Sequence, residues 1–211
     1  QATLATAMIA LSDNSATDTL IATLGRDEVA ERLAKIGNGA PDRTLPFLTT
    51  LEAFALKMSA NDTARAAYLA LPEAKQAAWL DTFSAGLERR AISDAELVSG
   101  PRYIDSIEWF ASPADMVALL AYLERLDDPF VRQILSINPG VGKSDAARWA
   151  YLGSKGGSEP GVISFAFLVT SKSGQNYAIS GSWNDPNAPV DRPRFQMLMN
   201  RLLNLTADIV E

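Results

Sequence analysis

The sequence predicts an α+β protein in which a large helical region precedes a small antiparallel sheet and a C-terminal helix. Within residues 2–148, most apolar residues recur at helical spacing. Residues 161–183 contain two runs rich in β-branched and aromatic residues, and residues 193–210 return to helical spacing. We therefore expect a helical region over residues 1–148 and the strands with the final helix over residues 149–211, as parts of one domain.

The helical region is predicted to begin with three short helices. Residues 2–11 are almost all apolar, as in a helix that is buried on all sides. The polar tripeptide Ser12-Asp13-Asn14 ends this helix, and a second helix covers residues 16–24. A third helix over residues 26–36 is expected to stop at Gly37, because glycine favours helix C-termini.

Later helices are marked by capping residues and prolines. A polar loop over residues 38–46 leads to a helix that starts at Thr49 or Thr50. A long helical stretch is expected over residues 72–90, and Ser93 with Glu96 has the spacing of a capping box. The helix over residues 112–126 begins with serine, proline and an acidic residue in its first turn, which is a strong helix start.

From Trp149 onward the sequence is typical of strands. Residues 161–171 and 175–183 flank a short turn with a glycine, and this pattern predicts an antiparallel hairpin. Residues 150–154 are expected to form a shorter strand before it, and residues 193–210 an amphipathic helix. Such a thin sheet would leave backbone groups unpaired at its edges. We expect either a missing N-terminal segment or another chain to complete it.

Composition excludes several classes of function. The chain has 19 Lys and Arg against 25 Asp and Glu, so it offers no basic surface for nucleic acid. It contains no Cys and no His, which excludes disulfides, thiol catalysis, imidazole bases and the usual zinc ligands. No apolar run reaches the roughly 18 residues of a membrane span. We expect no metal and no cofactor. Because the first residue is Gln1 and not methionine, we expect this chain to be the remainder of a longer protein.

Two polar clusters are candidates for function, and each also has a purely structural interpretation. Ser12-Asp13-Asn14 could simply cap a helix. Lys155-Gly156-Gly157 could be a glycine-rich turn with a solvated lysine, or a cation beside backbone that a ligand can approach closely. Residues 140–144 resemble the end of a phosphate-binding loop, but Ile137 stands where that pattern needs glycine, and we reject nucleotide binding.

Four segments together carry a resemblance to a known superfamily. They are MIALSDNSATDTLI (residues 8–21), PFLTTLEAFALK (46–57), WFASPADMVALL (109–120) and YLGSKGGSEPGVISFAFLV (151–169). In this order they resemble the serine β-lactamase and penicillin-binding-protein superfamily, specifically class A β-lactamase-like serine hydrolases. The resemblance covers essentially the whole chain. Ser-Asp-Asn matches the second motif of the family, and Lys-Gly-Gly matches the third, Lys-Thr/Ser-Gly, with glycine in place of the hydroxyl residue.

The chain departs from the family pattern in two respects. The first motif, Ser-x-x-Lys, is absent, since no serine has a lysine three residues later and few residues precede Ser12. The resemblance therefore implies a C-terminal portion that lacks the nucleophile and the N-terminal strands. Class A enzymes also carry a glutamate that activates water in the loop matching residues 38–45, where Asp42 is the one carboxylate here. We do not expect Asp42 to replace it or antibiotic hydrolysis to be efficient. Residues 59–108 resemble additional helical material.

The resemblance also implies roles for individual residues. Ser12 would relay a proton toward the leaving group, and Lys155 would stabilise negative charge and attract a substrate carboxylate. Asn14 would hold the substrate side chain, and the backbone N–H of Ser158 would be one oxyanion-hole donor. The glycines would let substrate lie along the strand edge. The predicted site comprises the catalytic residues Ser12 and Lys155 and the substrate-binding residues Asn14, Gly156, Gly157 and Ser158.

Three hypotheses follow from these observations. The first is a periplasmic or secreted bacterial serine hydrolase that acts on a β-lactam, peptide or ester, with this chain alone inactive. The second is a non-catalytic binding or interaction module of the same fold. The third is a helical scaffold in which Ser-Asp-Asn is only a cap. The first two require the heads of Ser12, Asn14 and Lys155 to converge on one cleft.

Overall fold

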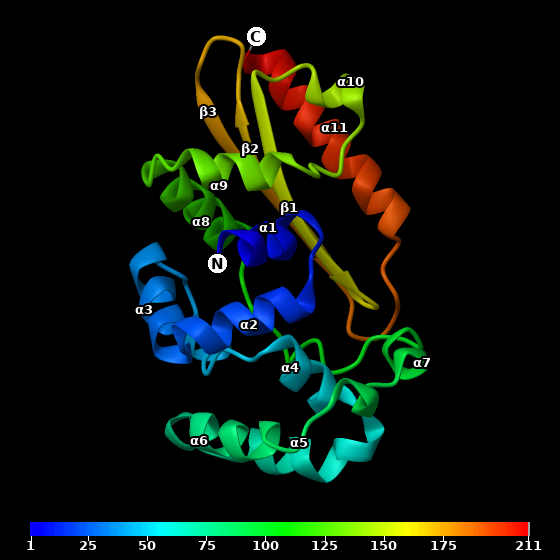
Figure 1. Cartoon of the computed structure of the whole chain (residues 1–211). Coiled ribbons are helices and arrows are strands. Elements are labelled where there is room, and N and C mark those ends of the chain that lie inside the picture. Colours follow the sequence, from blue (N-terminus) through cyan, green and yellow to red (C-terminus); the bar gives the residue numbers. More distant parts are fainter. Residues whose placement is uncertain (211) are drawn as a thin grey trace.

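The computed structural model describes residues 1–210 and has the predicted α+β architecture (Figure 1). The first helices are α1 (Ala2–Ala10), α2 (Asn14–Leu24), α3 (Arg26–Ile36) and α4 (Thr50–Lys57). The next group comprises α5 (Asp62–Leu69), α6 (Glu73–Ser84) and α7 (Asp94–Leu97). The last helices before the sheet are α8 (Pro113–Arg125), α9 (Pro129–Ser136) and α10 (Lys143–Ala146). The strands β1 (Tyr151–Glu159), β2 (Val162–Thr170) and β3 (Asn176–Asn184) precede α11 (Arg192–Val210).

The three strands form one antiparallel sheet in the order β1-β2-β3. The hairpin predicted from the last two strand-like runs is confirmed as β2 and β3, where Thr170 pairs with Asn176. The prediction for the first strand was too short. β1 continues to Glu159, because the residues after Ser154 still pair with β2, for example Lys155 with Ala166. Lys155-Gly156-Gly157 therefore lies inside an edge strand and not in a turn.

Several predicted helix starts and stops are confirmed by hydrogen bonds. Asp13 caps α2, since its Oδ1 accepts from the backbone N–H of Ala16 at 3.0 Å. Thr49 with Glu52 forms a capping box at the start of α4, and so does Ser112 with Asp115 at the start of α8. Gly37 ends α3 with left-handed backbone angles, which cost glycine little.

Two helical boundaries differ from the prediction. The stretch expected over residues 72–90 ends at Ser84, and only a short 3₁₀ helix at Arg89–Ala91 follows. The helix expected over residues 112–126 ends as predicted, but a further helix that the sequence analysis did not predict, α9, begins at Pro129. Asp128 is the reason, because its Oδ1 accepts from the N–H of Phe130 at 2.9 Å and caps the new helix.

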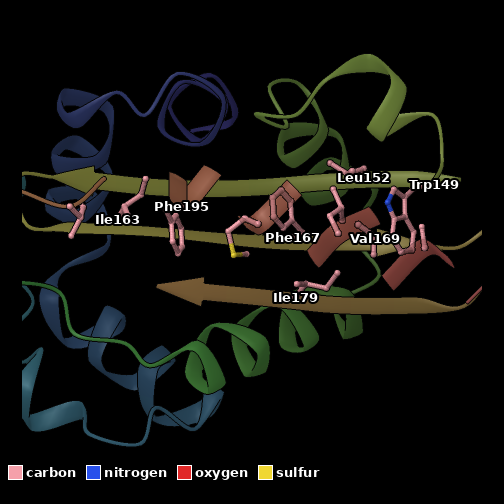
Figure 2. Close-up of a cluster of buried hydrophobic side chains, with 11 residues drawn as sticks. Trp149, Leu152, Ile163, Phe167, Val169, Ile179 and Phe195 are labelled. Carbon is pink, nitrogen blue, oxygen red and sulfur yellow. The ribbon is translucent and has the colours of Figure 1, made fainter. Parts of the chain in front are cut away.

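The sheet is covered on both faces by separate apolar clusters. Side chains of β2, including Phe167 and Val169, pack with Phe195 and Leu203 of α11 on one face (Figure 2). On the other face, β2 residues pack against helices α8 and α9 through Leu120 and other apolar residues. The alternation of side chains along a strand sends neighbouring residues to these two faces. The predicted final helix is thus the cover of one sheet face.

The expectation that the first helix is buried on all sides is wrong for the structure described. Of α1, only Ala10 is buried, although the helix is almost wholly apolar. It packs against α2 and α9, and its residues 4–9 are only partly buried. The outer side of α11 is likewise apolar and exposed at Leu198, Leu202 and Leu205. Apolar surface of this kind is typical of a contact face.

Residues 59–108 form a helical lobe that shares an apolar core with α4. Helices α5 and α6 lie at the end of the molecule away from the sheet (Figure 1). Tyr68 packs on Trp79, which stacks on Phe83 with ring centroids 4.9 Å apart. Across residues 1–210, no helix is long and apolar enough to cross a membrane.

Candidate active site

The break between α1 and α2 brings Ser12 to the sheet. Ser12 adopts φ +53°, a left-handed conformation that serine rarely takes, so the chain reverses within three residues. Asp13 then caps α2 and fixes the turn. In this position the Ser12 hydroxyl oxygen accepts a hydrogen bond from Nζ of Lys155 at 2.8 Å. Two polar clusters that lie 143 residues apart in the sequence are therefore in direct contact.

Lys155 is a half-buried cation whose hydrogen-bond partners are neutral. Its ammonium donates to Ser12 Oγ and to the backbone carbonyl of Gly156. Burial lowers the pKa of Lys155 from its ordinary value, since desolvation penalises the charged form. Within the described chain, no carboxylate lies at ion-pair distance from this ammonium. Its positive charge is therefore directed at the cleft and can attract an anion.

All six sequence-predicted site residues line one cleft of about 890 Å³. Its walls come from the end of α1 and the start of α2 on one side and from the outer edge of β1 on the other. Residues from both predicted clusters are present, namely Ser12, Asn14, Lys155, Gly156, Gly157 and Ser158. The convergence that separates the first two hypotheses from the helical scaffold is thus present in the structure.

The two glycines of β1 differ in their surroundings. A Cβ built on Gly156 would lie 2.8 Å from Cε1 of Phe165, which is closer than real side chains approach. A Cβ on Gly157 would meet nothing nearer than the hydroxyl of Ser164 at 3.9 Å. The Phe165 ring therefore fills the space in which a residue larger than glycine would stand at position 156.

The outer edge of β1 offers free backbone groups to the cleft. A two-residue turn joins Glu159 to Val162, and these residues pair. Because hydrogen bonds alternate along an antiparallel pair, the N–H of Ser158 then points away from β2. Ser158 is exposed and lines the cleft. An N–H at this edge is available to a carbonyl oxygen in the cleft.

Sequence reasoning missed a charged cluster at one end of the cleft. Glu108 and Glu159 both line it, and the ammonium of Lys57 donates to a carboxylate oxygen of each. Strand alternation was the available signal for Glu159, because it shares a face of β1 with Lys155 once the strand is long enough. Asp42 lies in a short 3₁₀ helix, is exposed, and is not among the lining residues.

No cation site is evident in this part of the molecule. Among residues 1–210, no group of three or more acidic side chains is arranged to hold a metal ion. The functional groups of the cleft are therefore an ammonium, hydroxyls, an amide, carboxyl groups and backbone N–H groups. Such a set suits proton transfer and the stabilisation of an oxyanion.

Comparison with known proteins places the chain in a family. The model of the beta-lactamase enzyme family matches residues 2–200. The chain belongs to this family. A search of curated proteins gave no match.

Solved β-lactamase structures share the fold at low sequence identity. The TLA-1 extended-spectrum β-lactamase is 11% identical, with a TM-score of 0.56 and coverage of 99% of this chain and 63% of its own. A class A β-lactamase from Mycobacterium abscessus is 14% identical, with a TM-score of 0.51 and coverage of 98% and 64%. The L2 protein in complex with relebactam is 16% identical, with a TM-score of 0.52 and coverage of 99% and 63%. This family member thus spans somewhat less than two thirds of these structures.

Proposed function

We propose that this chain is the C-terminal part of a β-lactamase-like serine hydrolase that cleaves an amide, β-lactam or ester through a serine acyl-enzyme. The observation that carries the proposal is the 2.8 Å hydrogen bond from Lys155 Nζ to Ser12 Oγ inside one cleft. Family membership supplies the reaction class. A periplasmic or secreted location is proposed from the family alone.

Ser12 is proposed to carry a proton to the leaving group. Its oxygen already accepts a hydrogen bond from Lys155, so its own O–H remains free to donate into the cleft. As the attacking serine loses its proton, the Ser12 hydroxyl can receive a proton and pass its own to the leaving nitrogen or oxygen. The nearby ammonium stabilises the negative charge that develops during this transfer.

The substrate is proposed to lie along the outer edge of β1. Lys155 attracts a substrate carboxylate, because its charge has no acidic partner among residues 1–210. The N–H of Ser158 serves as one oxyanion-hole donor, and the nucleophile's own N–H serves as the other. Asn14, at the start of α2, holds the substrate side chain with its amide, and Gly157 leaves room for the substrate backbone.

The attacking serine is proposed to come from a segment outside these residues, or from another chain, that also completes the sheet. None of the serines in this sequence has the Ser-x-x-Lys spacing. Three surfaces favour such a partner: the only partly buried apolar helix α1, the exposed leucines of α11 and the free edge of β3. The shorter length relative to the solved structures also favours it.

Covalent labelling with a fluorescent penicillin tests this proposal. The 211-residue chain alone should remain unlabelled. Joined to a segment that supplies Ser-x-x-Lys, it should be labelled, and Ser12→Ala or Lys155→Ala should slow labelling by about a hundredfold or more. Lys172→Ala, in the exposed turn between β2 and β3, is the matched control and should not change the rate. If the chain alone is labelled, it contains a nucleophile of its own, and the proposal that the attacking serine lies elsewhere is wrong.

A non-catalytic binding module of the same fold is the second candidate. The observation that favours it is the Phe165 ring beside Gly156, which leaves no space for the hydroxyl residue of the family motif. The loop over residues 38–45 also lacks the water-activating glutamate. If the completed protein binds penicillin reversibly but forms no covalent adduct, the binding module is the correct assignment and the hydrolase is wrong.

A further inference from the structure

Lys57 is a buried cation that joins three distant segments. It is the last residue of α4, and its side chain is 1% exposed. Its ammonium donates to Oε1 of Glu108 at 2.5 Å and to Oε1 of Glu159. Glu108 lies between α7 and α8, and Glu159 is the last residue of β1. The cluster therefore ties the helical lobe and α4 to the end of the strand that forms the cleft wall.

The same end of β1 is held from a second side. The turn after Glu159 contains Gly161, where a Cβ would lie 2.7 Å from the side chain of Pro101. The next residue, Arg102, donates from its Nε to the backbone oxygen of Lys57 at 2.7 Å. The turn thus packs directly on the lobe. Within residues 1–210, β1 pairs only with β2, so these contacts supply the support that a second neighbouring strand would give.

Glu159 is partly buried beside a second carboxyl group, and its pKa is raised. Burial and the neighbouring Glu108 raise the pKa of Glu159 to about 8, and Lys57 opposes this shift. Near neutral pH Glu159 therefore keeps its proton. The charged groups that face Glu159 are Lys57 from α4 and Glu108 from the segment before α8, with Arg102 bound to the Lys57 carbonyl. A protonated Glu159 lowers the cost of burying two carboxyl groups side by side.

We propose that Lys57 is a positioning residue of the cleft, which fixes the Ser158 end of β1 through its hydrogen bond to Glu159. Ser158 precedes Glu159 directly, and two glycines precede Ser158, so the strand has little side-chain packing of its own there. Anchoring Glu159 sets the position of the Ser158 N–H along the cleft edge. This inference deepens the proposed hydrolase and rests on it for the oxyanion-hole role of Ser158.

Backbone amide NMR of the ¹⁵N-labelled 211-residue chain tests the positioning role without any catalysis. The Ser158 amide shift should titrate with a midpoint near pH 8, and Glu159→Gln should remove this titration. Lys57→Met should raise the midpoint and speed hydrogen exchange of the Glu159 N–H about tenfold, because local opening becomes easier. Lys57→Arg, which keeps the charge and the donors, should restore slow exchange.

A double variant and a surface control separate anchoring from general stability. If Lys57→Met fails to fold, Lys57→Met with Glu108→Gln is measured in its place, because it takes the second carboxyl group out of a site that has lost its cation. Fast exchange of the Glu159 N–H is expected again. Lys35→Met disrupts an exposed ion pair on α3 and should leave the Ser158 amide unchanged. Slow exchange of the Glu159 N–H in the double variant would overturn the proposal. So would a Ser158 amide shift that titrates in the same way after Glu159→Gln. Penicillin labelling does not depend on these amide shifts. Failure of the hydrolase proposal can therefore be told apart from failure of the positioning role.

Discussion

Replacing Gly156 by alanine should destabilise the protein because of one aromatic ring. The added Cβ would lie 2.8 Å from Cε1 and 3.1 Å from Cδ1 of Phe165, so the ring must move by several tenths of an ångström. Phe165 stacks on Phe167 and Phe195 with centroid distances of 5.9 and 6.3 Å, and the movement is transmitted to α11. Overpacking of this kind costs about 1–3 kcal/mol. Alanine also reduces the conformational freedom of the unfolded chain, which raises the free energy of unfolding by about 0.4–1 kcal/mol.

The neighbouring glycine provides the matched control. Gly157→Ala places its Cβ 3.9 Å from Ser164, so the unfolded-state gain of about 0.4–1 kcal/mol should appear without the clash. Urea denaturation of both variants should give free energies of unfolding that differ by about 1–3 kcal/mol. A double-mutant cycle with Phe165→Leu should show coupling, since the two residues are in contact. Equal effects of the two alanines, or no coupling to Phe165, would refute this reasoning.

Three further predictions concern stability. Leu203→Ala should lower the free energy of unfolding by about 2–5 kcal/mol in urea denaturation, because this side chain is fully buried between α11 and the sheet. Leu202 is 42% exposed, so Leu202→Ala should change the free energy of unfolding by no more than about 0.5 kcal/mol. Asp18→Asn should cost about 1–2 kcal/mol in thermal unfolding, since its two carboxylate oxygens accept from the first two backbone N–H groups of α4 and an amide can accept through only one. Because the folded state raises the pKa of Glu159 from 4.5 to about 8, it binds that proton more tightly than the unfolded chain does. The free energy of unfolding should therefore fall between those pH values, by at most about 1.4 kcal/mol per unit, and Glu159→Gln should remove this component. A pH dependence unchanged in Glu159→Gln would contradict the assignment of that proton.

Local features of the fold could be predicted from the sequence because their causes lie within a few residues. The capping boxes at Thr49 and Ser112 join residues three positions apart, and Gly37 ends a helix through its own backbone angles. The β2–β3 hairpin likewise depends on strand propensity and a short turn. The start of α9 was missed because Asp128 has the same local appearance whether it ends one helix or caps the next.

Only part of the site could be predicted from the sequence in the same way. Motif resemblance selected Ser12 and Lys155, but the sequence gives no distance between residues so far apart. Their contact at 2.8 Å follows from the packing of α1 on α9, which itself packs on β1. The extent of β1 depended on pairing with β2, which no property of the two glycines indicates.

Long-range contacts alone decided the charged end of the cleft and the burial of each surface. Lys57 appears as an ordinary helix-terminal lysine until Glu108 and Glu159 approach it from other segments, and Phe165 restricts Gly156 only because the two strands are in register. Apolar composition predicted a buried first helix, yet burial requires neighbours on every side, and α1 has them on only part of its surface. Composition and capping are properties of short stretches of chain, whereas burial, proton sharing and the shape of a cleft belong to surfaces that meet only after folding.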